Sequence, residues 1–174
     1  MGDRHGENLL FDERNGDLVH VDFNCLFELG KTFPKPEMVP FRLTHNMVDA
    51  MGLSKTEGVY QAACEETLKV FRANAESLIS VLEGFVHDPL VEWSKNKRRG
   101  QQHQASGANK AEDPETIQAE TAQAMLAQVR RKLGGNEPNV SSSLSVKGQV
   151  QELIQVATSS KNLSEMYVGW NAFM

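Results

Sequence analysis

The sequence predicts a mainly α-helical fold that carries one small β-hairpin near its N-terminus. Beyond residue 55, apolar residues recur at spacings of three and four over long stretches, which is typical of amphipathic helices. Near the start, two short apolar runs flank Asn15-Gly16, and Asn-Gly is the strongest short-range hairpin signal. With 174 residues, of which 40% are hydrophobic, the chain can bury one moderate core.

The hairpin is expected to pair Leu9–Asp12 with Leu18–Asp22 across a turn formed by residues 13–17. This pairing places Asn8 at the entrance of the hairpin and Asp22 at its exit. It therefore brings two polar side chains together.

Three segments follow the hairpin. Residues 25–40 are expected to form a loop without regular structure, because they contain three prolines and a glycine. Residues 41–52 predict a helix that is closed by Gly52. One long helix is then expected from Thr56 or Glu57 onward. Its predicted buried face consists of Tyr60, Cys64, Leu68, Phe71, Ala75, Leu78 and Leu82.

The chain changes character after this helix. Residues 87–93 are expected to end the packed region, and residues 94–113 to form a disordered linker. The basic run at 97–99 is expected to be solvated, with a nuclear-import or docking signal as the alternative. A helix is predicted to begin at Pro114 and to stop at Gly134-Gly135. Its apolar face consists of Ala122, Met125, Val129 and Leu133.

The C-terminal segment combines a helical stripe with an aromatic cluster. Tyr167, Trp170 and Phe173 are expected to pack, because an unpacked aromatic terminus would fray. We expect them to dock beside residues 25–40 and to brace that loop. Insertion into a membrane surface is the weaker alternative, because residues 159–174 contain a single basic residue. The apolar stripe before them consists of Val146, Val150, Leu153, Ile154 and Ala157.

Composition narrows the class of protein. The formal charge of −5 argues against nucleic acid as a direct ligand. Cys25 and Cys64 have no metal-ligand spacing and fit buried thiols in a reducing compartment. No apolar stretch approaches the roughly 18 residues of a membrane span, and no signal peptide opens the chain. A soluble, intracellular protein is therefore expected.

The spacing of three polar residues predicts phosphoryl-transfer chemistry. The catalytic loop of protein kinases, H-R-D-x-x-x-x-N, places a proton-accepting Asp five residues before a metal-binding Asn, and a D-F-G Asp supplies another metal contact. Asp3, Asn8 and Asp22 reproduce this set. The alternative is that Asp3 and Asn8 are turn residues and that Asp22 caps a strand.

Two departures from the ordinary kinase pattern carry a family resemblance. The histidine follows the aspartate in Asp3-Arg4-His5, and Asn24 replaces the glycine of D-F-G. This form resembles the phosphatidylinositol 3-kinase superfamily. Residues 144–174 resemble the FATC tail of the phosphatidylinositol 3-kinase-related protein kinases, a tail that lipid kinases are not expected to carry. The resemblance implies the C-terminal lobe of a protein-kinase-like fold, followed by a helical FATC tail.

Within this family, residues 21–27, 39–48 and 87–93 resemble the branch that acts in the replication-stress checkpoint. The nonsense-mediated-decay branch is the nearest competitor, because it also carries Asn after the D-[FY] pair. Residues 25–27 and 45–47 favour the checkpoint branch.

The resemblance implies a role for each residue of the site. Asp3 would act as the catalytic base, and His5 would stabilise charge near the γ-phosphate. Asn8 and Asp22 would bind ATP through Mg²⁺, with Mn²⁺ as the substitute. Asp3 and His5 are thus the predicted catalytic residues, and Asn8 and Asp22 the predicted metal and cofactor ligands.

The resemblance makes residues 25–40 the activation loop, which meets the phosphate acceptor. Its predicted residues include Cys25, Phe27, Lys31 and Pro40. Lipid kinases are expected to have a markedly basic loop here, whereas the basic and acidic residues of this loop balance. A protein acceptor is therefore favoured over a phosphoinositide.

The family also implies partners and a place in the cell. Protein substrates with Ser/Thr-Gln sites, a regulatory subunit bound outside this chain, and a nuclear role in the DNA damage response are expected. Direct nucleic-acid binding and stable membrane insertion are not expected.

We divide the chain into a kinase C-lobe portion (1–93), a linker with a regulatory helix (94–141) and a FATC domain (142–174). No kinase N-lobe motif precedes the catalytic loop, so the chain is expected to be the C-terminal part of a longer protein and inactive alone. A pseudokinase remnant that binds partners, or a lipid kinase, are the alternatives.

Overall fold

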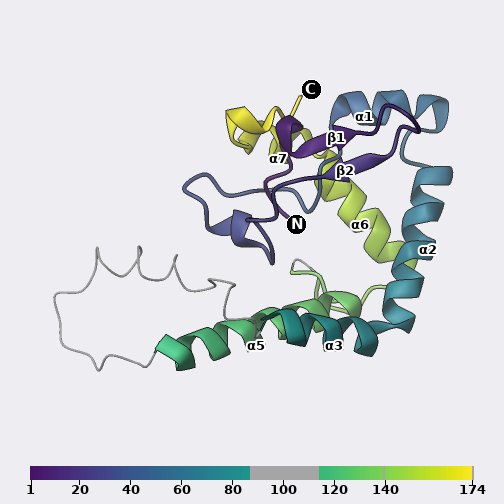
Figure 1. Cartoon of the computed structure of the whole chain (residues 1–174). Coiled ribbons are helices and arrows are strands. Elements are labelled where there is room, and N and C mark those ends of the chain that lie inside the picture. The colour runs from purple at the N-terminus through teal and green to yellow at the C-terminus, as the bar shows by residue number, and fades with distance from the viewer. Residues whose placement is uncertain (87–113, 139, 174) are drawn as a thin grey trace. The chain divides into compact units, whose positions relative to one another are not determined.

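The computed structural model describes residues 1–86, 114–138 and 140–173 (Figure 1). The predictions for 87–93 and for the linker 94–113 lie outside these residues. The chain forms two compact units, one made of residues 1–66 and 146–174 and the other of residues 67–145. The C-terminal residues therefore belong with the N-terminal ones. In keeping with the prediction, the fold is mainly helical and contains a two-stranded antiparallel hairpin.

The hairpin joins β1 (Leu9–Phe11) to β2 (Leu18–His20). Its register pairs Leu9 with His20, Leu10 with Val19 and Phe11 with Leu18. Both strands are shorter than predicted. The first strand stops at Phe11 because the next residue belongs to the turn. The Asp12 carboxylate accepts hydrogen bonds there from the backbone N–H and the guanidinium of Arg14. The second ends before Asp22, whose backbone adopts a left-handed conformation with a φ of 56°.

The loop 25–40 contains one short regular turn, the 3₁₀ helix η2 (Leu29–Thr32). The prediction of no regular structure was therefore wrong for these four residues. The reason is local, because the three prolines lie at positions 34, 36 and 40, all after the turn has closed. The Glu37 N–H donates to the Gly30 carbonyl at 3.0 Å and folds the rest of the loop back onto this turn.

The helix predicted over 41–52 is shorter in the structure. Helix α1 spans His45–Ala50, after Thr44 in an extended conformation at its N-cap. Residues 41–44 do not join the helix, because the fully buried Leu43 and Thr44 are packed into the core in an extended path. Gly52, with a φ of 74°, closes the helix as predicted and opens the 3₁₀ turn η3 (Gly52–Ser54).

The long helix expected from residue 56 is two helices. Helix α2 spans Val59–Ala73 and α3 spans Ala75–Val86, with Asn74 in a turn between them. The Asn74 side chain donates to the Val70 carbonyl at 2.8 Å, an interaction by which asparagine competes with regular helix bonding. The predicted face is half-buried except for Phe71, which is exposed, and Ile79 of α3, which lies next to that face, is buried.

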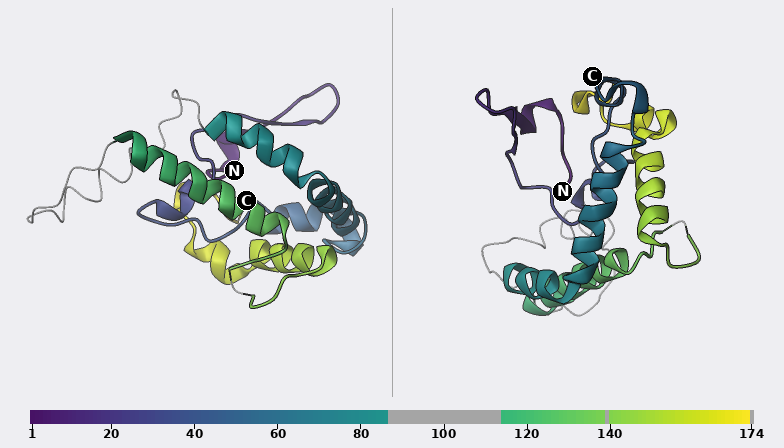
Figure 2. Two further views of the ribbon diagram at one scale, coloured as in Figure 1. Left: turned by 90° about the horizontal axis from the view of Figure 1, so that it is seen from below. Right: turned by 90° about the vertical axis from the view of Figure 1, so that its right-hand side faces the viewer.

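The second unit is organised around α3 and helix α5 (Pro114–Leu133), which lie side by side (Figures 1 and 2). Among the described residues of this unit, Ile79, Ala122 and Leu126 are buried apolar side chains. Arg130 of α5 forms an ion pair with Glu83 of α3 at 3.2 Å. Helix α5 begins at Pro114 as predicted.

The end of α5 uses glycine for a steric reason. Gly135 has a φ of 83°, and a β-carbon there would overlap the Leu144 carbonyl oxygen. That carbonyl accepts a hydrogen bond from Arg72 at 3.0 Å, and the Leu144 N–H donates to the Gly135 carbonyl at 2.9 Å. The stop predicted at Gly134-Gly135 is confirmed.

The C-terminal residues of the first unit form α6 (Val146–Thr158), α7 (Ser160–Glu165) and the 3₁₀ turn η4 (Val168–Trp170). Val150, Ile154 and Ala157 of the predicted stripe are buried, and Val146 and Leu153 are half-buried. The pattern did not predict that Gln149 is buried beside them. A core cluster continues along the chain after α6. It consists of Leu163, Met166, Trp170 and Ala172, with Val39 packed against it.

Across the parts of the chain that the structure describes, no helix combines the length and the apolar character needed to cross a membrane.

Candidate active site

Asp3 is held by its backbone on both sides. Its N–H donates to Oε1 of Glu37 at 2.6 Å, and its carbonyl accepts a hydrogen bond from Nδ2 of Asn8 at 2.8 Å. Its φ of 56° lies in the left-handed region, which Asp tolerates better than most residues. Both anchors are made by the main chain of Asp3, and its carboxylate takes part in neither.

His5 faces the Asp3 carboxylate. Its Nε2 lies 4.0 Å from Oδ2 of Asp3, and its Nδ1 accepts a hydrogen bond from the Glu7 N–H at 3.2 Å. A nitrogen that accepts carries no proton, so the hydrogen-bond network assigns the proton of the neutral ring to Nε2. That N–H is directed to the side where Asp3 lies.

Asn8 and Asp22 each carry a side-chain oxygen that could bind a metal, and the two residues lie on neighbouring segments of the backbone. Asn8 is 7% exposed, and its Nδ2 donates to the Asp3 carbonyl, so Oδ1 is the side-chain oxygen that could bind a metal. Asp22 is exposed, and its Oδ1 accepts from the Asn24 N–H at 3.0 Å. The Val21 N–H donates to the Asn8 carbonyl at 3.2 Å and so fixes the two segments side by side.

Arg4 joins these segments, and the sequence reasoning missed it. Its side chain is buried, with 5% of the residue exposed. Its guanidinium donates to the carbonyls of Gly2 at 2.8 Å and Val21 at 2.8 Å, and also to those of Asn8 and Asp22. One planar fork thus ties the segment that carries Asp3 to the segment that carries Asp22. Its position between the two predicted catalytic residues was the signal available in the sequence.

Cys25 and Glu37 of the activation loop lie against the start of the chain. Cys25 is buried, and its carbonyl accepts a hydrogen bond from the Gly2 N–H at 2.7 Å. Burial raises the pKa of the Cys25 thiol, and the negative charges of Glu37 and Asp3 raise it further. The thiol therefore stays protonated next to the site.

The other predicted loop residues lie further out. Phe27 is half-buried with a φ of 48°, and Pro40 is exposed. Lys31 pairs with Glu28 of the same loop at 3.0 Å. The charge of Lys31 is thus matched within the loop.

Glu37 is the second residue that the sequence reasoning missed. In the sequence it is only one of the acidic residues that balance the loop's lysines. Its carboxylate lies against Gly30 and Gly2, and a β-carbon at Gly30 would overlap it. Both glycines leave the room that this carboxylate needs to reach Asp3.

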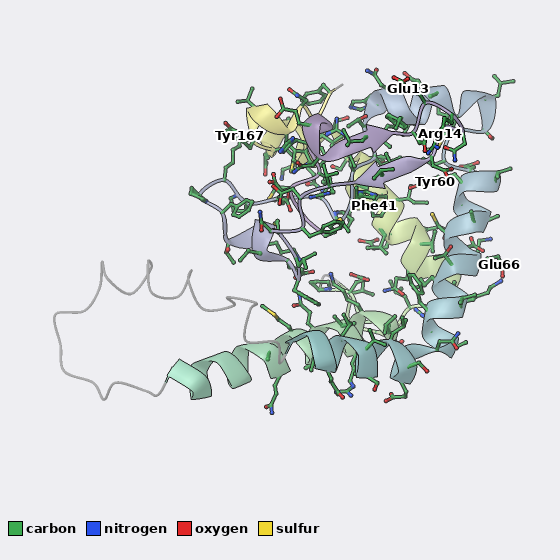
Figure 3. All side chains as sticks on the ribbon, in the orientation of Figure 1. Glu13, Arg14, Phe41, Tyr60, Glu66 and Tyr167 are labelled. Carbon is green, nitrogen blue, oxygen red and sulfur yellow. The ribbon has the colours of Figure 1, made fainter. Side chains whose placement is uncertain are left out.

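The three aromatic residues of the tail differ in how deeply they are buried. Trp170 is 4% exposed, and the Arg42 guanidinium lies 4.7 Å from its ring centroid. Phe173 stacks on His45 with ring centroids 5.8 Å apart but is 55% exposed, so it packs only in part. Tyr167 departs from the expectation, because it is 61% exposed and lies at the outer side of the tail (Figure 3). The buried position next to it is taken by Met166, whose sulfur accepts from the Met38 N–H at 3.3 Å.

The oxygen donors suit Mg²⁺, which binds through one or two protein ligands together with substrate phosphates. Asn8 supplies an amide oxygen and Asp22 a carboxylate oxygen, both hard ligands. Among the described residues no group of three or more His, Cys, Asp or Glu gathers around one point.

Comparison with known families agrees with this geometry. Residues 1–95 match the family described as phosphatidylinositol 3- and 4-kinase, and residues 143–174 match the FATC domain. The chain belongs to the phosphatidylinositol 3- and 4-kinase family and carries a FATC domain.

Two curated relatives are similar to nearly the whole of this chain. Protein kinase rad3 from Schizosaccharomyces pombe is 50% identical over 173 residues, which cover 99% of this chain and 7% of that protein. Serine/threonine-protein kinase ATR from Arabidopsis thaliana is 46% identical over 170 residues, 98% of this chain and 6% of that protein. The chain thus spans a small fraction of the length of the curated relatives it matches.

A solved structure shows the same fold. The FAT and kinase domain of CtTel1 superposes with a TM-score of 0.78 at 39% sequence identity, covering all of this chain and 11% of that one. The prediction of a kinase C-terminal lobe with a helical tail is confirmed by this match.

Proposed function

We propose that this chain is the C-terminal catalytic part of a serine/threonine protein kinase that transfers the γ-phosphoryl group of ATP to Ser or Thr in proteins. The observation that carries the proposal is the hydrogen-bonded unit formed by Asp3, Asn8 and Asp22 through Arg4. Phosphoryl transfer depends on positioning and charge stabilisation, which such a rigid unit provides.

Each residue has one task in this scheme. Asp3 orients the acceptor hydroxyl and takes its proton. His5, with its Nε2–H, stabilises charge on the transferring group. Asn8 and Asp22 would hold Mg²⁺, with Mn²⁺ as the substitute, and the cation would supply neutralisation of the phosphate charge. The activation loop, including Cys25, Phe27, Lys31 and Pro40, meets the acceptor.

The proposed member of the family is an ATR-like checkpoint kinase. Relatives named rad3 and ATR are 50% and 46% identical to this chain, whereas a tel1 kinase from Emericella nidulans is 40% identical. We also propose that this kinase phosphorylates Ser/Thr-Gln sites and acts in the DNA damage and replication-stress response. It would be located in the nucleus, with a regulatory subunit that binds outside this chain. The division at 1–93, 94–141 and 142–174, and the inactivity of the chain alone, belong to the same proposal.

A lipid kinase is the second candidate, because the matching family model is described by phosphatidylinositol 3- and 4-kinases. The ion pair of Lys31 with Glu28 disfavours it, since this lysine is matched within the loop rather than offered to an inositol phosphate. The nonsense-mediated-decay branch and a non-catalytic binding module are the remaining alternatives.

An acceptor test separates these candidates. The 173 matched residues of rad3 kinase would be replaced by this chain, and the chimera would be given ATP and Mg²⁺ with a Ser-Gln peptide, its Ser-Ala counterpart or phosphoinositide vesicles. We expect phosphorylation of the Ser-Gln peptide above the Ser-Ala peptide, and none of the lipid. Lipid phosphorylation alone would establish the second candidate, and an inactive chimera would favour the binding module.

A further inference from the structure

Arg42 connects three separate segments of the first unit. Its Nη1 donates to the Trp170 carbonyl at 2.7 Å and to the Arg4 carbonyl at 3.2 Å, and its Nη2 donates to the Asn171 carbonyl at 3.0 Å. Two of these acceptors belong to the C-terminal tail and the third to the catalytic loop.

The geometry of this contact suits a guanidinium group. Its plane also lies over the Trp170 ring, 4.7 Å from the centroid, and a planar fork can reach several carbonyls at once. The indole Nε1 of Trp170 is buried and has no acceptor among the described residues. The hydrogen bonds between η4 and residue 42 therefore run through the tail's backbone carbonyls.

The Arg4 carbonyl is part of the predicted catalytic loop. It belongs to the peptide that joins Arg4 to His5, next to Asp3. The Arg4 side chain in turn donates to the carbonyls of Asn8, Val21 and Asp22. Hydrogen bonds thus lead from the tail carbonyls through Arg42 to the Arg4 carbonyl. From the side chain of the same arginine they lead on to the backbone carbonyls of Asn8 and Asp22, the proposed metal ligands.

We propose that Arg42 is a positioning residue that couples the tail, residues 166–173, to the catalytic loop, residues 3–8. The tail sets the place of the Arg42 guanidinium, and the guanidinium sets the place of the Arg4–His5 peptide. The catalytic consequence of this coupling rests on the proposed function, whereas the coupling itself does not.

The coupling is measured first by amide hydrogen exchange on the 174-residue chain. The Asn8 N–H is bonded to the His5 carbonyl and the Val21 N–H to the Asn8 carbonyl, so both report on the catalytic loop. In Arg42→Lys we expect both amides to exchange about three- to tenfold faster, the factor for the loss of one ordinary hydrogen bond. Arg131→Lys, an exposed position on α5, is the matched control and should change neither amide.

A double substitution then separates coupling from local packing. Trp170→Leu removes the ring beneath Arg42 and should also speed exchange at Asn8 and Val21. In the Arg42→Lys background it should add nothing at these two amides, because the path from the tail is already cut. Additive effects, or unchanged exchange at Asn8 and Val21 in Arg42→Lys, would overturn the proposal.

The kinetic arm uses the rad3 chimera. Arg42→Lys should lower kcat about tenfold to a hundredfold through misplacement of Asp3 and His5, with KM for ATP within about twofold. Ile154→Ala, at a buried position in α6, is a destabilised control that should lower Tm but leave kcat unchanged. Normal kcat in Arg42→Lys would contradict the proposal. An inactive unsubstituted chimera would count against the proposed function, and the exchange experiment would then decide the coupling.

Discussion

The Glu37 carboxylate accepts a hydrogen bond from the backbone N–H of Asp3 at 2.6 Å, across 34 residues of chain. This bond joins the activation loop to the residue proposed as catalytic base. It acts on the main chain of Asp3, whose φ of 56° requires support from its surroundings. The geometry of Asp3 thus depends on where the activation loop lies.

Removing the Glu37 carboxylate should destabilise the chain. In Glu37→Ala the Asp3 N–H loses its acceptor, and we expect a loss of about 1–3 kcal/mol in the free energy of unfolding. Glu37→Gln keeps an amide oxygen that can accept the same hydrogen bond and should lose less than Glu37→Ala. Urea unfolding followed by circular dichroism measures both, and equal losses would show that the bond to Asp3 is not what matters.

Gly30 tests the same contact from the other side. A β-carbon in Gly30→Ala would overlap the Glu37 carboxylate and push it away from Asp3, so this variant should resemble Glu37→Ala. Gly6→Ala is the matched control, because nothing lies within 4 Å of the added carbon, and its effect should stay within about 0.5 kcal/mol. If Gly30→Ala were as stable as the unsubstituted chain, the close packing of Glu37 on Gly30 would be refuted.

The sequence predicted the parts of the fold that depend on local signals. Asn15-Gly16 predicted the hairpin, and Gly52 and Gly135 predicted two helix ends, because each requires a particular residue type at a particular place. The break at Asn74 was not predictable, since asparagine is also tolerated within helices and the apolar spacing continues across it.

The candidate site was predictable only in its side-chain chemistry. Asp3, Asn8 and Asp22 follow a known spacing, whereas the contacts of Glu37 and Arg42 are made to backbone atoms far away in the sequence. Every residue except proline offers the same N–H and carbonyl, so no pattern of side chains reveals these partners. The exposure of Tyr167 could not be predicted either, because the spacing of the aromatic residues does not tell which of them enters the core.

Trp170 and Tyr167 form a matched pair for the tail. Trp170→Ala removes a buried side chain from the cluster of Leu163, Met166 and Ala172, and should lower the free energy of unfolding by about 3–5 kcal/mol. Tyr167→Ala should change it by no more than about 0.5 kcal/mol, because the ring is mainly in solvent. Urea unfolding checks both values.

The same pair tests whether the tail braces the activation loop. Hydrogen exchange across residues 25–40 should rise in Trp170→Ala and remain unchanged in Tyr167→Ala. Unchanged exchange in Trp170→Ala, combined with loss of liposome binding, would support the membrane alternative instead.

The burial of Tyr60 on α2 predicts that this side chain titrates at alkaline pH. Burial, and then the neighbouring Cys64, raises the pKa of Tyr60 to about 12. Because the folded state favours the neutral phenol, this contribution to stability is complete below about pH 10, the ordinary pKa of tyrosine, and is lost as the pH rises towards 12. In Tyr167→Phe, where Tyr60 is the remaining tyrosine, absorbance at 295 nm should titrate with a midpoint near 12. A midpoint near the ordinary value would show that Tyr60 is solvated.

The most direct test of the account is the rate of phosphate transfer by the rad3 chimera after substitution of its proposed site. Asp3→Ala and Asp22→Ala, compared with Asp49→Ala at an exposed position on α1, should each lower the rate on the Ser-Gln peptide at least about a hundredfold, since general-base catalysis alone contributes about 10²–10⁴-fold. Because both aspartates have a φ of 56°, which Asn tolerates better than Ala, Asp3→Asn and Asp22→Asn are the matched variants: they should lose transfer in the same way, with circular dichroism and Tm close to those of the unsubstituted chimera. The account predicts near-complete loss of transfer in these variants and normal transfer in Asp49→Ala; near-normal transfer in Asp3→Ala or Asp22→Ala would contradict it.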